Sequence, residues 1–126
     1  MKSVISAATI LIFIIILVVV SYSYTQTTVE QMLASIGENE KFVAKNDWSA
    51  AENEMSKLNQ IWTKRRGFLT TITSHSVIED IDKRLSKINF ALKIRKNDEF
   101  FLELGAARLS IYTLLEQQKL SISNVF

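Results

Sequence analysis

The longest pattern in the chain is a run of uncharged, almost wholly apolar residues from Val4 to Tyr24. At about 1.5 Å per helical residue, such a run crosses the roughly 30 Å hydrocarbon core of a bilayer. The side chains assigned to the membrane anchor are Val4, Ile5, Leu11, Phe13, Leu17, Val20, Tyr22 and Tyr24. The two tyrosines would hold the outer end of the helix at the headgroups. The sequence therefore predicts a transmembrane signal-anchor helix over residues 1–24.

The charges that flank this run predict its orientation. Lys2 lies on the short side, whereas the long side carries three glutamates before its first basic residue, Lys41. Because basic residues near a span favour the cytoplasm, we expect a single-pass protein of the cell membrane with a cytoplasmic N-terminus and an extracytoplasmic C-terminal domain. A cleaved signal peptide is the alternative, since Ser21-Tyr22-Ser23 loosely matches a cleavage site. The apolar run is longer than that of an ordinary signal peptide, which favours a retained anchor.

Beyond the span, apolar residues recur in steps of three and four, the spacing of one helix face. After Trp48 the first series is Ala51, Met55, Leu58, Trp62, Leu69 and Ile72, with Arg65 as the single polar intruder. The second series is Ile78, Ile81, Leu85, Ile88 and Leu92. Between the two series, the β-branched stretch 70–73 and the capping-box spacing of Ser76 and Glu79 predict a turn near residues 74–76.

A further helix is expected to begin at Asn97 or Asp98, both good N-caps, and to continue to about Lys119. It is apolar on nearly every side, so it must be central in the bundle or dock on another protein. The expected interaction face is Phe100, Leu104, Ala107, Ile111 and Leu114, and a second apolar set is Leu102, Leu109 and Tyr112. Gly105 would allow a close helix crossing.

A weaker apolar pattern, Val29, Met32, Leu33 and Ile36, can prolong the membrane helix as a stalk until Gly37 interrupts it. The expected organisation is an anchor over 1–24, a juxtamembrane stalk or helix over 25–46, and an extracytoplasmic bundle over 47–126. The fold class is all-α, with three to four helices in the bundle. The absence of proline and the presence of only three glycines agree with helices rather than sheets.

One short motif occurs twice in the sequence, which would be consistent with two packed helical hairpins that form a repeat. Lys45-Asn46-Asp47 recurs as Lys96-Asn97-Asp98, and Lys57-Leu58 recurs at the same offset as Arg108-Leu109. Two stacked hairpins would produce such an echo. Chance agreement is the alternative, because few positions match.

Composition removes several functional classes. With no cysteine, a lipid-modified cysteine, a disulfide framework, thiol catalysis and a cysteine zinc site are excluded. With Lys2 set aside, 14 basic residues face 13 acidic ones, so no nucleic-acid partner is implied. The cluster Lys64-Arg65-Arg66 is interpreted as a solvated surface, with contact to lipid headgroups or an acidic partner as the alternative.

Candidate chemistry is sparse. His75 could share a helix face with Glu79 and Asp82 as a metal site, but the predicted turn would move it off the helix, so a structural role is favoured over metal binding or base catalysis. Trp48 and Trp62 are interpreted as core anchors rather than a ligand cage. No glycine-rich phosphate loop, nucleophile elbow or HExxH motif occurs. We therefore expect no enzyme, no cofactor, and neither a catalytic nor a metal site.

Several soft motifs, in order, resemble an uncharacterised family of short bacterial proteins, a domain of unknown function. They are the uncharged span, Asp47-Trp48, Trp62, Ser74-His75, Glu79-Asp80-Ile81, Asn97-Asp98 and the closing stretch from Lys119 to Phe126. The resemblance implies one N-terminal membrane helix and a helical extracytoplasmic part. It implies no activity, and it is consistent with an accessory role beside other membrane proteins.

The first functional hypothesis is a membrane-anchored, non-enzymatic interaction or accessory protein that docks on a membrane partner or self-associates. The second is an extracytoplasmic ligand-binding or sensory module that acts through a lateral partner, because few residues precede the span. A hydrolase or metal-dependent enzyme would rest only on His75 and scattered carboxylates. The bilayer is the one partner that the pattern itself requires.

Overall fold

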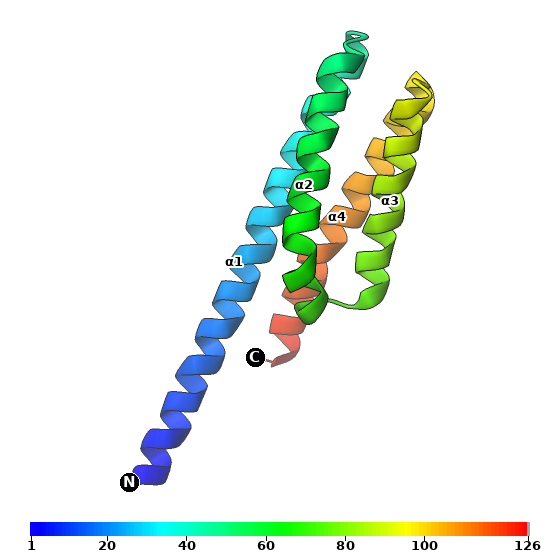
Figure 1. The fold of residues 1–126 in the computed structure, drawn as a ribbon. Helices are drawn as coiled ribbons and strands as arrows, with labels where there is room; N and C mark the ends of the chain where they lie inside the picture. The colour runs from blue at the N-terminus through cyan, green and yellow to red at the C-terminus, as the bar shows by residue number, and fades with distance from the viewer. Residues whose placement is uncertain (126) are drawn as a thin grey trace.

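The computed structural model describes residues 1–125 as four helices joined by short turns (Figure 1). The helices are α1 (Lys2–Ala44), α2 (Trp48–Ile72), α3 (His75–Lys93) and α4 (Asn97–Val125). The predicted all-α class is confirmed, although α4 continues beyond the expected end at Lys119. Phe126, the last residue of the expected bundle 47–126, lies outside the described residues.

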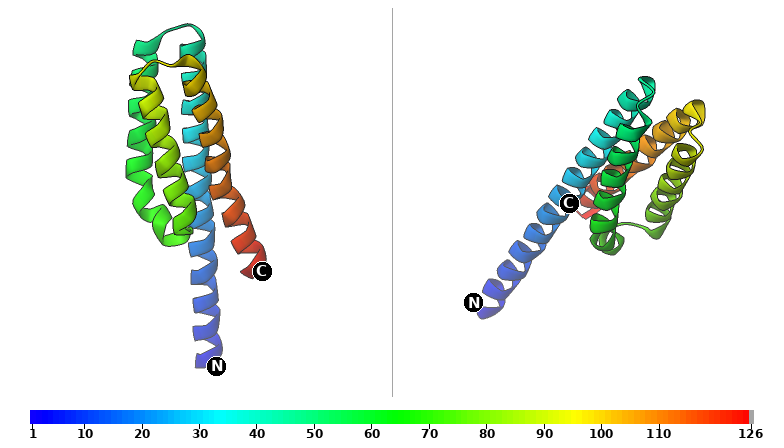
Figure 2. Two further views of the ribbon diagram at one scale, coloured as in Figure 1. Left: turned by 90° about the vertical axis from the view of Figure 1, so that its right-hand side faces the viewer. Right: turned by 45° about the horizontal axis from the view of Figure 1, so that its top comes forward.

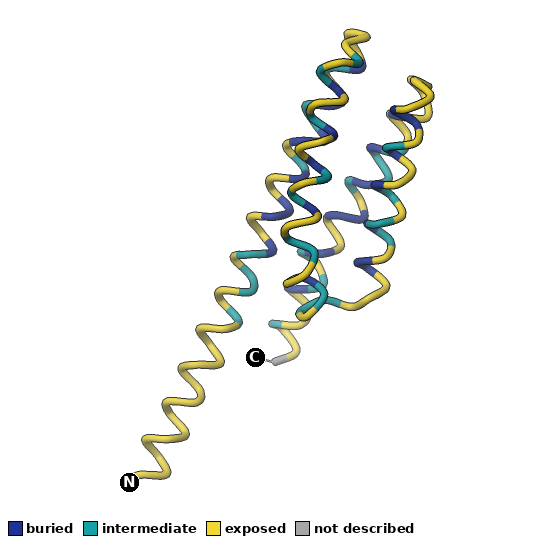
Figure 3. The backbone as a smooth tube through the Cα atoms, viewed as in Figure 1, coloured by how far each residue is buried: buried dark blue, intermediate teal, exposed yellow. Residues whose placement is uncertain are grey.

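The first half of α1 projects beyond the other helices (Figures 1 and 2). Its apolar side chains are exposed rather than buried within the chain, as the yellow part of Figure 3 shows. By length and composition, α1 is one helix that could cross a membrane. Because exposed apolar side chains are costly in water, this segment needs an apolar surrounding.

The second half of α1 belongs to the bundle. Its buried residues are Thr25, Thr28, Val29, Met32, Ser35, Ile36, Asn39 and Val43. The helix passes through Gly37 without a break, so the expected interruption there is wrong. A mid-helix glycine costs only about 1 kcal/mol relative to alanine, and the buried neighbours Ile36 and Asn39 hold the turn in place. The segment expected as a stalk is therefore one wall of the core.

The four helices run alternately up and down (Figure 2). Helix α1 packs against α2 and α4, and α3 packs against the same two helices, so α1 and α3 lie on one diagonal. The largest fully buried side chains come from all four helices and include Met32, Leu58, Ile81 and Phe100. Each helix places its apolar face toward this shared core, as in an antiparallel four-helix bundle.

The turns α1–α2 and α3–α4 have the same geometry. Each contains one non-glycine residue with a left-handed backbone, Asn46 with φ 57° and Arg95 with φ 52°. The amide of the following residue donates to the carbonyl five positions earlier. These hydrogen bonds join Asp47 to Phe42 at 2.8 Å and Lys96 to Ala91 at 3.2 Å. Both ends are Schellman caps, which satisfy otherwise unpaired carbonyls of the preceding helix.

The two hairpins therefore correspond at an offset of 49 residues, the separation of Asn46 from Arg95. Buried positions agree at this offset: Val29 with Ile78, Met32 with Ile81, Met55 with Leu104, and Trp62 with Ile111. The echo in the sequence has a different offset and pairs buried Leu58 with Leu109, which is 72% exposed. Two similar hairpins exist, but that echo does not mark their correspondence.

We expect Gly37→Ala to raise the free energy of unfolding by about 1 kcal/mol, because alanine is the better helix former. A Cβ added at Gly37 would meet no other atom within 4 Å, so no clash opposes the gain. Urea unfolding of the full-length protein in detergent, followed by circular dichroism, measures it. A lower stability for the variant would mean that α1 is interrupted at this position.

Candidate functional site

The face of α4 expected to dock on a partner lies inside the bundle. Phe100, Leu104, Ala107, Ile111 and Leu114 are each at most 1% exposed. They pack against α1 and α3, so in this fold they are not available to a partner. That expectation is corrected: the five residues form the core face of α4.

The opposite side of α4 carries the second apolar set. Leu102 is 70% exposed, Leu109 72% and Tyr112 48%, and we call these three residues the outward face of α4. Gly105 lies between them, and a Cβ added there would meet no atom within 4 Å. The expected close crossing at Gly105 is therefore not made with another helix among residues 1–125. This leaves a helix surface with large apolar side chains and a small residue at its centre.

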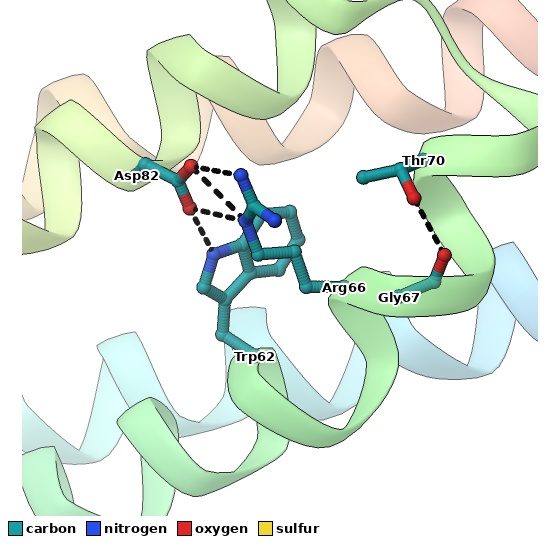
Figure 4. Close-up of polar contacts among 5 residues, drawn as sticks. All are labelled: Trp62, Arg66, Gly67, Thr70 and Asp82. Atoms are coloured by element: carbon teal, nitrogen blue, oxygen red, sulfur yellow. Dashed lines mark hydrogen bonds and ion pairs between the residues drawn. The ribbon is translucent and has the colours of Figure 1, made fainter.

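A polar cluster joins α2 to α3 (Figure 4). The indole N–H of Trp62 donates to Oδ1 of Asp82 at 2.7 Å, and the guanidinium of Arg66 donates to both carboxylate oxygens at 2.7 to 3.0 Å. The hydrogen bonds from Arg66, with a smaller contribution from Trp62, hold the pKa of the Asp82 carboxyl below its ordinary value. The cluster therefore fixes α3 against α2.

We expect Asp82→Ala to destabilise the bundle by about 1 to 3 kcal/mol, because it leaves the largely buried Trp62 indole N–H without an acceptor. Glu79→Ala, at an exposed position of the same helix, is the control. Since folding lowers the pKa of Asp82, its stabilising contribution is present above about pH 4 and is lost as pH falls through the folded value. Urea unfolding of the variant and of wild type should therefore show a smaller difference near pH 3 than at neutral pH; an equal difference at both would contradict this assignment.

Beside this cluster lies an open groove of about 550 Å³ between α2 and α3. Its walls include Glu52, Gln60 and Lys64. Two of its other lining residues, Asn59 and Asn89, hydrogen-bond with each other in both directions at 3.0 and 3.1 Å. The groove is a polar concavity that a small ligand could use, although its two amides already hydrogen-bond with each other.

His75 is the first residue of α3 and is exposed, with Ser74 as the N-cap. The prediction that the turn moves His75 off the helix is wrong, because α3 begins earlier than the Ser76 cap would require. Asp82 is instead held by Trp62 and Arg66. Within residues 1–125, no group of three or more His, Asp and Glu side chains could hold a metal ion.

The two tryptophans have separate partners. Trp62 is 5% exposed and belongs to the core, whereas Trp48 is only half-buried and packs edge-on against Phe100 with ring centroids 5.8 Å apart. Trp62 is thus the anchor that was expected, and Trp48 is a weaker one.

The three neighbouring basic residues point to different surroundings. Lys64 is exposed, and Arg66 binds Asp82. The Arg65 guanidinium lies 4.8 Å from the centroid of the Tyr24 ring, a cation–π contact. Arg65, the one polar residue in the apolar series of α2, therefore covers Tyr24, the last aromatic residue of the predicted span.

A family model described as a domain of unknown function (DUF4363) matches residues 19–125. The chain belongs to the DUF4363 family. The resemblance to an uncharacterised family is thereby confirmed. No curated protein and no solved structure matches the chain.

The DUF4363 match begins inside α1 and continues through α4. It therefore includes the upper end of the apolar run, Tyr24 with its Arg65 contact, and both hairpins. In this DUF4363 member, the outward face of α4 and the cluster around Asp82 lie within the matched range. Sequence reasoning noted the exposed residues of α4 without separating them from the core face, and it missed the pairing of Trp62 with Asp82.

Proposed function

We propose that this protein is a membrane-anchored, non-enzymatic accessory protein that docks on a membrane protein or on a second copy of itself. The observation that carries the proposal is the outward face of α4, where Leu102 and Leu109 are more than two-thirds exposed. Large contiguous apolar surfaces are uncommon on soluble monomers and mark interaction sites. The orientation we propose, with the bundle outside the cytoplasm, rests on the lopsided charges around the span.

Anchoring restricts how a second copy could dock. Both copies would enter the same membrane in the same direction, so their α4 helices would run parallel and Leu109 would face Leu109. A parallel contact about an axis normal to the membrane is a closed two-fold arrangement. Gly105, at the centre of the face, would let the two backbones approach.

A ligand-binding or sensory module is the second candidate, and the groove between α2 and α3 is the observation that favours it. Asn59 and Asn89 pair with each other there, so a polar ligand would have to break a reciprocal amide pair before it could bind. Among residues 1–125, no side chain covers the outward face of α4 in this way, so we rank docking first.

Because the chain has no cysteine, single cysteines can be placed at will. We expect Leu109→Cys, carrying a photoactivatable maleimide in native membranes, to give one discrete cross-linked product. A product at twice the chain mass would identify a second copy, and another mass would identify a different membrane protein. Lys57→Cys, at an exposed position of α2, is the matched control. The same products from both positions, or none from Leu109→Cys, would overturn the docking proposal.

A further inference from the structure

The last turns of α4 extend past the α2–α3 turn and lie beside the lower part of α1 (Figures 1 and 2). Here Ile122 lines two apolar depressions together with residues of the predicted span, among them Ile15, Val18 and Val19. Val18 precedes Tyr24 by six residues, which is about 9 Å along a helix. If α1 spans the membrane up to Tyr24, this end of α4 lies at the depth of the upper acyl chains.

The larger depression is a groove of about 420 Å³ that α1, α2 and α4 form together. Its apolar walls are Leu17, Val18, Phe68, Ile72 and Ile122. The three polar residues that line it are Ser21, Gln118 and Ser121. The Gln118 amide is engaged, since it donates to the Ile72 carbonyl at 3.4 Å.

The rim of this groove has the side chains expected at the headgroup level of a bilayer. Phe68, which is 40% exposed, packs edge-on against Tyr24 with ring centroids 4.7 Å apart. Arg65 covers the same tyrosine ring with its guanidinium. Aromatic rings and a cation at the end of an apolar span are typical of the membrane interface, where the cation can meet lipid phosphate.

We propose that the groove holds an acyl chain of an outer-leaflet phospholipid, and that the end of α4 rests in that leaflet. This inference depends on the proposed anchoring of α1. Two of the groove's walls, Leu17 and Val18, belong to the span itself, so the medium that surrounds the span also fills the groove. Contact between apolar walls and hydrocarbon is favourable, whereas contact between the same walls and water costs free energy.

The test uses the full-length protein in phosphatidylcholine vesicles that contain a phosphatidylcholine with a diazirine in its acyl chain. After irradiation, lipid adducts are mapped by mass spectrometry. We expect adducts on the span of α1, on Phe68–Ile72 of α2 and on Gln118–Ile122 of α4, with none on α3. Adducts on Ile72 of α2 are diagnostic, because this half-buried side chain lines the groove.

A variant that fills the groove, Ser121→Trp, should lower the α2 adducts severalfold and leave unchanged the adducts on those residues of the α1 span that do not line the groove. Ser86→Trp, at an exposed position of α3, is the matched control and should change neither. Adducts confined to α1 would overturn the groove assignment while the anchor stands. No adducts on α1 would overturn the anchor, and the groove assignment with it.

Discussion

Trp62→Ala should lower the free energy of unfolding by about 3 to 5 kcal/mol, the range for removing a large buried aromatic side chain. Trp62 is 5% exposed, and its indole also donates to Asp82, so the variant loses packing and a hydrogen bond between α2 and α3 together. A loss of this size approaches the whole stability of a small domain. Urea unfolding of the full-length protein in detergent, followed by circular dichroism, would measure it.

Trp48→Ala is the matched control, because it removes the same side chain from a half-buried position. Its effect should be clearly smaller, since Trp48 packs on one edge of Phe100 and exposes the rest. Trp62→Phe should recover part of the packing but not the hydrogen bond to Asp82. Equal losses for the two alanine variants would show that Trp62 is not the main anchor of the α2–α3 side.

The buried faces of α2 and α3 could be predicted from the sequence. All five apolar positions assigned to α3, from Ile78 to Leu92, are buried, and so are Ala51, Met55, Leu58, Trp62 and Leu69 of α2. Each of these helices has one apolar face, so its 3.6-residue periodicity fixes the side that packs inward. The intruder Arg65 fits the pattern because its guanidinium covers Tyr24.

Helix α4 could not be oriented in the same way. It carries two apolar faces, and periodicity alone does not say which one meets α1 and α3. The choice depends on where those helices stand, which is a tertiary property. The structure buries the face from Phe100 to Leu114 and leaves Leu102 and Leu109 outside.

The glycine and capping-box signals in the sequence did not fix the helix ends, because packing of the neighbouring residues had the larger effect. Gly37 does not end α1, because the residues on both sides of it are held in the core. Ser76 and Glu79 have capping-box spacing, yet α3 starts at His75 and Ser74 occupies the N-cap. A cap contributes about 1 kcal/mol, so a few buried apolar residues can move a helix end by two positions.

Sequence patterns could not predict the polar cluster around Asp82 or the groove that α1, α2 and α4 form at the base of the bundle. Trp62 and Asp82 are on different helices, and their pairing depends on the direction of the α2–α3 turn. The groove needs residues from α1, α2 and α4 at one level, which follows only from the helix lengths and the way the hairpins pack.

The sidedness of the membrane has the largest expected effect of all, since it is an all-or-none result. Asn53 is exposed on α2, far along the bundle from the span, and Ser3 lies at the opposite end of the apolar run. With the bundle outside, a membrane-impermeant maleimide should label Asn53→Cys in intact cells. The same reagent should reach Ser3→Cys only after lysis, because the proposed orientation, argued from the lopsided flanking charges, puts that end in the cytoplasm.

Both variants start from a chain without cysteine, so each labelled band reports a single position. An anchored, extracytoplasmic bundle predicts a full-length, membrane-bound band labelled at Asn53→Cys in intact cells and unlabelled at Ser3→Cys. Release of a shortened chain into the medium would show that the apolar run is a cleaved signal peptide. Labelling of Asn53→Cys only after lysis would place the bundle inside the cell and contradict the proposed orientation.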